Sequence, residues 1–322
     1  MSPVLYLVIP CYNEKDVLPI VSQKILIKLC SLIEREKISD QSKILFIDDG
    51  SKDETWNIIK ALSDESQYLE GVKLLANRGH QNALLAGLMV AKDHCDIAIS
   101  MDADMQDDIE VIDEFIDKYN DGCAVVYGVR KSRNKDKMFK RRTAQGFYRF
   151  MSKMGVDLVY NHADYRLMSN KALETLSDYK EVNLFLRGIV PIIGFKTDCV
   201  YYDRNERAAG KSKYSVSKMF NLAIDGITSF SVKPLRIIAV SGMVIAVLSV
   251  LFGLAYAIGS KIVGTAVEGW AALIVSIWTL GGIQLFCTGV LGEYIGKIYS
   301  EVKQRPRYEI ENITFKQDDM TI

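Results

Sequence analysis

Short apolar segments alternate with helical patterns along the first 200 residues, and this alternation limits the fold more than any other feature of the chain. It predicts an α/β domain with a mostly parallel sheet that helices cover on both faces. The expected strands are Val4–Ile9, Ile44–Ile47, Val72–Leu75, Ile97–Met101 and Ala124–Gly128. The expected helices lie between them, near Asp16–Glu36, Glu54–Leu69, Gln81–Lys92 and Ile109–Tyr119. Ligands of such sheets bind at the carboxyl ends of the strands, so the residues after each strand are the first candidates for a site.

Two acids follow the fourth expected strand, where the chain reads Met-Asp-Ala-Asp-Met-Gln-Asp over Met101–Asp107. The small Ala103 between Asp102 and Asp104 lets the backbone and a metal ion approach closely. Carboxylates in this number hold Mg²⁺ or Mn²⁺ when substrate phosphates complete the coordination shell, so a nucleotide diphosphate is the implied partner. A solvated acidic turn gives the same short pattern, and the interpretation therefore depends on the other strand ends.

Polar residues also follow the first and second expected strands, over Pro10–Glu14 and Asp48–Asp53. In the second stretch Gly50 permits a tight turn, and the polar residues after it can cap the next helix. Capping does not account for Asp48 and Asp49, which suit the donor groups of a nucleobase or of ribose hydroxyls. Both a structural and a functional interpretation of this turn stay open.

The third expected strand leads into Asn77–Asn82 and then a helix with small residues at Ala83, Ala86 and Gly87. Small side chains allow tight packing, and the amides at the start of a helix can face an anion. No second His or Cys stands at ligand spacing from His80, so we expect a helix-start or packing residue there and assign no zinc site.

The charge balance, the cysteine spacing and the first apolar stretch each limit the class of protein. The chain has 40 basic and 40 acidic residues and therefore no formal net charge. This balance gives no support for a nucleic-acid partner. The six cysteines lie far apart and form no Cys-x-x-Cys pair, as expected for reduced thiols of a protein that faces the cytosol. The first apolar stretch, Val4–Ile9, is too short for a signal peptide.

Two long runs without a charged residue, Ile237–Ile258 and Trp270–Gly292, mark the C-terminal third. Each is long enough to cross a hydrocarbon core of about 30 Å, so we expect two transmembrane helices. Basic residues gather on the outer flanks of the two runs, at Lys233, Arg236, Lys297, Lys303, Arg305 and Arg307. This asymmetry argues against buried helices of a soluble protein and places both termini and the N-terminal domain in the cytoplasm, in a multi-pass protein of the cell membrane.

The expected organisation has four parts: a catalytic domain over residues 1–214, an interfacial helix over 215–233, a transmembrane hairpin over 234–293 and a cytoplasmic tail over 294–322. Basic and aromatic residues interleave over Met138–Met154, as in a helix that lies on a bilayer. Packing of that stripe on the catalytic core is the alternative.

The order of the motifs resembles glycosyltransferase family 2. The motifs that carry this resemblance are Val8–Glu14, Asp48–Ser51, Asn77–Gly79 and Asp102–Asp107. Three further segments resemble its polyprenyl-phosphate branch, which includes bactoprenol glucosyltransferases and dolichol-phosphate mannose synthases: Val129–Arg133, Ala163–Met168 and Ala209–Ser215. The chain departs from the common pattern at His162, and at Asp107 and Asp108, where the family often has two prolines.

This resemblance implies a GT-A fold, Rossmann-like, that moves a sugar with inversion from a nucleotide-sugar donor to a polyprenyl phosphate acceptor at the bilayer. The family's nucleotide-sugar-binding positions fall on Pro10, Tyr12, Glu14, Asp49, Asn77 and Asp102. The resemblance assigns the cation to Asp102 and Asp104, with Asp104 the surer ligand, and it implies homo-oligomers that associate through their membrane regions.

The chemistry also follows from the acceptor. A phosphate monoester has a second pKa of about 6, so it is largely anionic at neutral pH and needs no strong base. The protein must instead neutralise two phosphate groups that come close together, which calls for a metal ion and several cations. The cations expected at the phosphates are Arg130, Arg133, Arg207, Lys211 and Lys213. We count Asp104, Arg130, Arg133 and Asp164 as catalytic, with Asp164 more suited to orienting a partner than to accepting a proton.

Three functions from different classes remain open. A polyprenyl-phosphate glycosyltransferase is preferred, with UDP-glucose as the first choice of donor and UDP-N-acetylglucosamine or GDP-mannose as alternatives. A processive polysaccharide synthase would be expected to carry a Gln-x-x-Arg-Trp motif and more spans, and the sequence has neither. A non-catalytic membrane scaffold would not need the acids and cations.

Overall fold

The computed structural model describes residues 2–131, 162–203, 228, 231–242, 244–245, 247–248, 251 and 270–315. Contacts divide the chain into two units. The first unit comprises residues 1–148, 158–214 and 305–322, and the second comprises residues 149–157 and 215–304.

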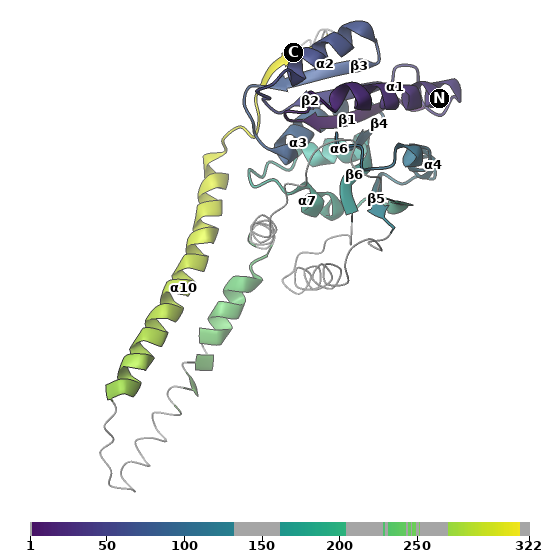
Figure 1. The fold of residues 1–322 in the computed structure, drawn as a ribbon. Coiled ribbons are helices and arrows are strands. Elements are labelled where there is room, and N and C mark those ends of the chain that lie inside the picture. Colours follow the sequence, from purple (N-terminus) through teal and green to yellow (C-terminus); the bar gives the residue numbers. More distant parts are fainter. Residues whose placement is uncertain are drawn as a thin grey trace, which may run out of the picture. The chain divides into compact units, whose positions relative to one another are not determined.

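One mixed sheet forms the centre of the first unit (Figure 1). Its described strands follow the order β7-β5-β6-β4-β1-β2-β3-β8. Four strands pair in parallel in its middle: β1 (Leu5–Cys11), β2 (Lys43–Asp48), β3 (Leu69–Leu74) and β4 (Ile97–Ser100). The register places Cys11 beside Asp48 and Val8 beside Ser100, so the ends of these strands meet at one edge. The predicted α/β fold with a mostly parallel sheet is confirmed.

The other strands complete the sheet on both sides. β6 (His162–Ser169) runs antiparallel between β4 and β5 (Val125–Arg130), and β7 (Thr197–Tyr202) is parallel to β5. On the opposite side β8 (Ile310–Ile313), from the segment that we expect to be the C-terminal tail, pairs antiparallel with β3. These added strands make the sheet mixed.

Helices cover both faces of this sheet. α1 (Leu18–Glu34), α2 (Thr55–Glu65) and α4 (Ile112–Asn120, after the short 3-10 helix η1, Ile109–Val111) share a buried cluster with the odd-numbered residues of β1. α3 (His80–Lys92) covers the other face and contacts α6 (Asn170–Ser177). A Cβ atom on Gly87 of α3 would lie 2.5 Å from Val8 Cγ1 and 2.6 Å from Ile47 Cγ1, so the small residue lets this helix press directly on β1 and β2.

Two neighbouring boundaries of the predicted elements are wrong, the end of the second helix and the start of the third strand. The helix expected over Glu54–Leu69 ends at Glu65, because Ser66 turns to an extended conformation with φ −141° and ψ 126°. Leu69 then begins β3 and is buried in the core, three residues before the expected start at Val72. Burial of Leu69 in the sheet outweighs its helical propensity.

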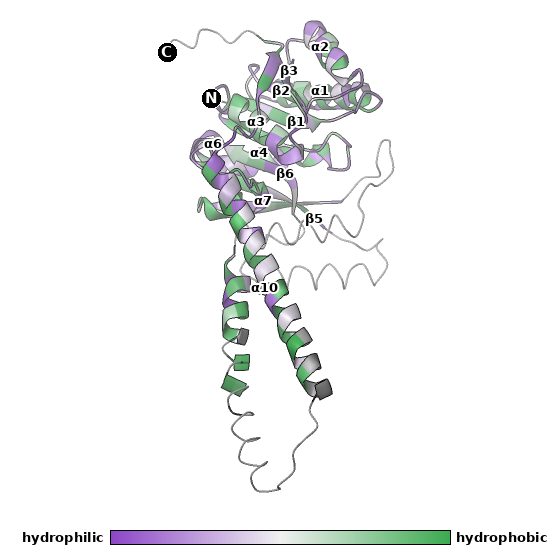
Figure 2. Ribbon diagram, turned by 90° about the vertical axis from the view of Figure 1, so that its left-hand side faces the viewer, coloured by the Kyte–Doolittle hydropathy of each residue, from purple (hydrophilic) through white to green (hydrophobic). Residues whose placement is uncertain are grey.

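The second unit contains α10 (Trp270–Lys303), whose N-terminal part is largely apolar (Figure 2). The Tyr294 hydroxyl of α10 donates to the carbonyl of Ser231 at 2.6 Å. Over the described residues, no helix has both the length and the apolarity that crossing a membrane requires.

Candidate active site

Side-chain and backbone hydrogen bonds join the turns that follow β1 and β2. The Asn13 N–H donates to Ser51 Oγ at 2.9 Å, and Asn13 Oδ1 accepts from the Lys52 N–H at 2.9 Å. The Glu14 N–H donates to Thr55 Oγ1 at 2.9 Å. Asn13 has a φ of +54°, a conformation that Asn tolerates better than most residues. The expected nucleotide-binding segment Pro10–Glu14 is therefore fixed on the second turn.

The Asp49 carboxylate connects that turn to the loop after β3. It accepts from the Arg78 N–H at 2.7 Å and from the Gly79 N–H at 3.0 Å. Gly50 lets the two loops meet, because its φ is +63° and a Cβ atom there would lie 2.6 Å from the backbone of Ala76. Asp49, expected to line the nucleotide site, uses both its oxygens to fix the backbone that leads into α3.

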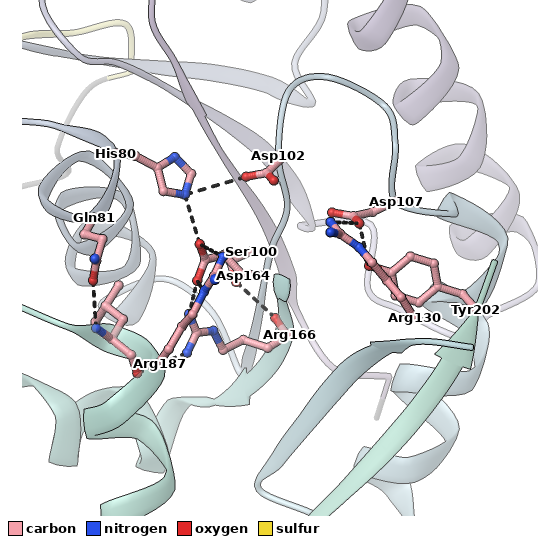
Figure 3. Close-up of polar contacts among 11 residues, drawn as sticks. His80, Gln81, Ser100, Asp102, Asp107, Arg130, Asp164, Arg166, Arg187 and Tyr202 are labelled. Carbon is pink, nitrogen blue, oxygen red and sulfur yellow. Dashed lines mark hydrogen bonds and ion pairs between the residues drawn. The ribbon is translucent and has the colours of Figure 1, made fainter. Parts of the chain in front are cut away.

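His80 begins α3 and lies between two carboxylates (Figure 3). Its Nε2 is 3.3 Å from Asp164 Oδ2 and 3.6 Å from Asp102 Oδ1. Burial acts to lower the pKa of His80, but the hydrogen bond to Asp164 and the charges of Asp102 and Asp164 outweigh it and raise that pKa. His80 is the first residue of α3, as one of the two predicted roles requires. Its contacts with the two carboxylates were not predicted, because a lone His gives no signal of carboxylates far away in the sequence.

Arg187, Arg166 and His80 surround Asp164 on β6. Arg187 Nε and Nη2 reach its two oxygens at 3.0 Å each, in a two-pronged contact, and Arg166 Nη2 lies 2.9 Å from Oδ1. Burial acts to raise the pKa of Asp164, but Arg187, His80 and Arg166 hold it well below the ordinary value. A carboxylate of this kind is a poor proton acceptor at neutral pH, which agrees with an orienting role.

Arg187 was absent from the sequence prediction. It lies on the short helix α7 (Leu186–Ile192), whose first N–H donates to Gln81 Oε1 of α3 at 2.9 Å. The Leu186 carbonyl accepts from Arg166 Nη1 at 3.3 Å. An arginine inside an apolar segment was the one available signal, since such a charge needs a partner when the segment is buried.

Asp102 and Asp104 follow β4, as predicted, with Ala103 buried between them. Burial raises the pKa of Asp102 to about 6, and the neighbouring charges of Asp107, Asp164 and Asp104 act in the same direction. Within the described residues, no group of three or more His, Cys, Asp or Glu side chains forms a complete metal site. The two carboxylates at this strand end nevertheless fit Mg²⁺ or Mn²⁺, which commonly bind one or two protein carboxylates together with substrate phosphates.

Arg130 ends β5 and pairs with Asp107, which is 1% exposed and lies 3.2 Å away. The Tyr202 hydroxyl of β7 donates to the same Asp107 oxygen at 2.5 Å. Asp108 accepts from the Glu110 N–H at 3.0 Å and thereby caps the helical turn that follows. The acids that stand where the family often has two prolines thus each have a structural partner.

The other residues that we predict to bind the nucleotide-sugar differ in their exposure to solvent. Pro10 is buried at the end of β1, Tyr12 is exposed, Glu14 is half-buried and Asn77 is exposed in the loop before α3. The predicted phosphate-binding residues outside the described part of the chain are Arg133, Arg207, Lys211 and Lys213.

Comparison with known proteins decides the family. The sequence model of Glycosyl transferase family 2 matches residues 6–177. The chain belongs to glycosyltransferase family 2. This family 2 chain is 54% identical to the uncharacterized glycosyltransferase YkoT of Bacillus subtilis, over 96% of this chain and 92% of the relative. It is 41% identical to the bactoprenol glucosyl transferase of Shigella phage SfX, over 95% of this chain and 98% of the relative.

A prophage bactoprenol glucosyl transferase homolog of Escherichia coli is also 41% identical, over 95% of this chain and 98% of the relative. The predicted family is confirmed, and the family 2 chain is a glycosyltransferase with an α/β fold of the GT-A type.

Proposed function

We propose that this protein transfers glucose from UDP-glucose to a polyprenyl phosphate, such as undecaprenyl phosphate, and so makes a lipid-linked sugar donor for modification of cell-envelope glycans. The observation that carries the proposal is the acidic strand end at Asp102 and Asp104 beside the group formed by His80, Asp164 and Arg187. Relatives named bactoprenol glucosyl transferases cover nearly the whole chain and support the choice of sugar and acceptor.

The reaction is a single displacement. An oxygen of the acceptor phosphate forms a bond to C1 of glucose while the bond from C1 to the diphosphate oxygen breaks, and UDP leaves with the bonding electrons. C1 is inverted as a result. The acceptor oxygen is already anionic, so no side chain has to remove a proton. The strongly acidic Asp164 is consistent with this scheme, because its carboxylate is committed to Arg166 and Arg187.

The protein's part is to bind and orient two anions. Asp102 and Asp104 would hold Mg²⁺ or Mn²⁺, and the bound ion supplies charge neutralisation of the leaving diphosphate. Arg130 is fixed by Asp107 at the end of β5, and with Arg133, Arg207, Lys211 and Lys213 it forms the set of cations that we assign to the phosphates. Arginine suits this task because its planar fork makes two parallel bonds to phosphate.

We further propose that the protein is anchored in the cell membrane with its catalytic unit and both termini in the cytoplasm. The support is the pair of uncharged runs with basic outer flanks, Ile237–Ile258 and Trp270–Gly292. Apolar side chains of α10 are exposed in the structure, among them Leu273, Ile277, Leu280, Leu285 and Phe286. Association of copies through these segments is part of the same proposal.

The test is a transfer assay with purified full-length protein, undecaprenyl phosphate and a panel of UDP-glucose, UDP-N-acetylglucosamine and GDP-mannose. Mass spectrometry of the lipid fraction identifies the sugar that is transferred. We expect a hexosyl lipid from UDP-glucose with wild-type protein and none with Asp104→Asn. A product from another donor alone would change the assigned sugar, and no lipid product from any donor would contradict the proposed function.

A further inference from the structure

The loop between β3 and α3 comprises residues 75–79 and includes Asn77, which we expect to bind the nucleotide-sugar. The last part of this loop is fixed on the turn after β2, because Asp49 accepts from the N–H groups of Arg78 and Gly79 at 2.7 Å and 3.0 Å. The first part has a different support, which comes from the segment that follows α10 in the sequence. The position of Asn77 therefore depends on contacts at both ends of the loop.

β8 supports the first part of the loop from the edge of the sheet, where it lies beside β3 (Figure 1). At the point where β3 passes into the loop, the Leu75 N–H donates to the Glu309 carbonyl at 2.9 Å. The Glu309 carboxylate also lies 4.0 Å from Arg78 Nη2, but both side chains are exposed, and an exposed ion pair contributes little. The Arg307 guanidinium donates to the Tyr179 carbonyl at 2.9 Å and so fixes the chain that leads into β8. The backbone bond to Leu75 is thus the main contact between this segment and the loop.

The other end of β8 is anchored through Thr314, the residue that follows the strand. Its N–H donates to the Gly71 carbonyl at 3.0 Å, and its hydroxyl oxygen accepts from the Gly71 N–H at 2.9 Å. The Ser63 hydroxyl of α2 donates to the same oxygen at 2.8 Å. Between the two ends, Lys73 Nζ lies 2.8 Å from the Glu311 carboxylate. Main-chain bonds and side-chain contacts of this kind are what hold an added strand on a sheet edge and fix its register.

Loss of β8 would make β3 the edge of the described sheet, because β3 has β2 on its other side. An edge strand leaves a row of N–H and carbonyl groups unpaired, and the ends of such a strand open most easily. The Leu75 N–H would lose its partner in the sheet. The loop after β3 would then keep only the support that Asp49 and the turn after β2 give to its later residues.

We propose that β8 is a positioning element of the nucleotide site: by pairing with β3 and holding Leu75, it orders the loop that carries Asn77. This inference rests on the proposed function only in its use of UDP as the nucleotide and of Asn77 as one of the contacts. A nucleotide that meets a disordered loop has to order the loop as it binds. Ordering the backbone of one residue weakens binding by roughly 5-fold to 30-fold, which is the effect that we expect from loss of β8.

The test replaces β8 within the full-length protein. The test variant carries Ile310→Gly, Glu311→Ser, Asn312→Gly and Ile313→Ser. The matched control carries the same replacement outside the described residues, as Asp318→Gly, Asp319→Ser, Met320→Gly and Thr321→Ser. Hydrogen exchange followed by mass spectrometry, without nucleotide, measures the protection of the loop amides, and calorimetric titration with UDP and Mn²⁺ measures the affinity for the nucleotide.

A synthetic peptide of residues 305–315 distinguishes the loss of a bound strand from general damage to the fold. The peptide is added in excess to the test variant, and both measurements are repeated. A second peptide with Thr314→Pro serves as its control, because proline lacks the N–H that donates to the Gly71 carbonyl.

We expect the test variant to lose protection over residues 75–79 and to bind UDP roughly 5-fold to 30-fold more weakly, while the control variant behaves as wild type does. The peptide of residues 305–315 should restore both properties, and the Thr314→Pro peptide should restore neither. Unchanged loop protection or unchanged UDP affinity in the test variant would overturn the inference, as would a wild-type protein that binds no UDP. Loss of protection throughout the sheet, without recovery when the peptide is added, would show a general loss of stability and also overturn it.

Loop protection without nucleotide is independent of the transferred sugar and of the lipid. If wild-type protein forms no lipid-linked glucose but the variants and peptides behave as expected, the proposed function fails and the inference stands. If the lipid product forms and the test variant keeps the loop protection and UDP affinity of wild type, the inference alone fails.

Discussion

Asp107 and Arg130 form an ion pair whose two halves differ in exposure, and this difference predicts unequal effects of removing each. The Asp107 side chain is 1% exposed and the Arg130 side chain is 24% exposed. Arg130→Met leaves a buried carboxylate without its cation. Asp107→Asn instead leaves a guanidinium that can turn toward water. Leaving the buried Asp107 charge without its partner therefore costs more free energy than leaving the partly exposed Arg130 charge without one.

The contacts give the magnitudes. Breaking a buried ion pair costs about 3–5 kcal/mol, and the Tyr202 hydroxyl still donates to Asp107 in Arg130→Met, so we expect about 3 kcal/mol for this change. In Asp107→Asn the amide oxygen still accepts from the Tyr202 hydroxyl and water partly replaces the lost charge-assisted bond, so we expect about 1.5 kcal/mol. The double variant should cost less than the sum, because the two residues share one interaction.

Thermal unfolding of the purified full-length variants measures these differences. A domain of this size loses about 2–4 °C in midpoint for each kcal/mol, so Arg130→Met should unfold roughly 6–12 °C below wild type and Asp107→Asn roughly 3–6 °C below it. Equal midpoints for the two variants at neutral pH, or a larger loss for Asp107→Asn, would refute the reasoning.

The remaining predictions concern the reaction and the membrane. Asp104→Ala should abolish transfer, and full activity of the wild-type protein in EDTA would contradict the proposed cation. Arg133→Ala should lower the transfer rate by roughly 10-fold to 100-fold with unchanged donor affinity, because a charge-assisted bond contributes about 1.5–3 kcal/mol and each 1.4 kcal/mol is a factor of about ten. Lys137→Ala should have little effect, since exposed charges contribute little, and equal mild effects of both would move the phosphate role to other cations. Cysteine labelling from outside intact cells should reach a probe at position 265 but not one at position 52, and labelling of the latter would exclude the proposed topology.

Local pattern was sufficient for the parallel half of the sheet and insufficient for the rest. β1, β2 and β4 are apolar runs that are buried on both faces, and their pattern is visible in the sequence without any knowledge of partners. β6 was not predicted as a strand, because it carries Asp164 and Arg166 in the interior. These charges are acceptable there only because they pair with each other and with Arg187, and that pairing depends on tertiary contacts.

The edge strand β8 was missed for a different reason. It has four residues, Ile310–Ile313, and its exposed pattern does not differ from that of a polar tail. Pairing with β3 supplies what the local sequence lacks: the Leu75 N–H donates to the Glu309 carbonyl at 2.9 Å, and the Thr314 N–H donates to the Gly71 carbonyl at 3.0 Å. A short strand of this kind forms because an open edge is available to it.

In the candidate site, too, local features could be predicted from the sequence and tertiary contacts could not. The acids at Asp102 and Asp104 could be predicted because a strand end is a local feature, whereas His80 and Arg187 acquire their roles through Asp164, which lies far from both in the sequence. Asp107 and Asp108, at the positions where the family often has prolines, show that one motif alone does not predict the contacts of its loop. Asp107 is compensated by Arg130 at the end of β5 and by Tyr202 at the end of β7, so the loop is held by partners outside the motif. A departure from a family motif therefore has to be judged together with the residues that the sheet brings beside it. Here Asp107 connects the acidic loop to Arg130, the cation that we assign to the acceptor phosphate.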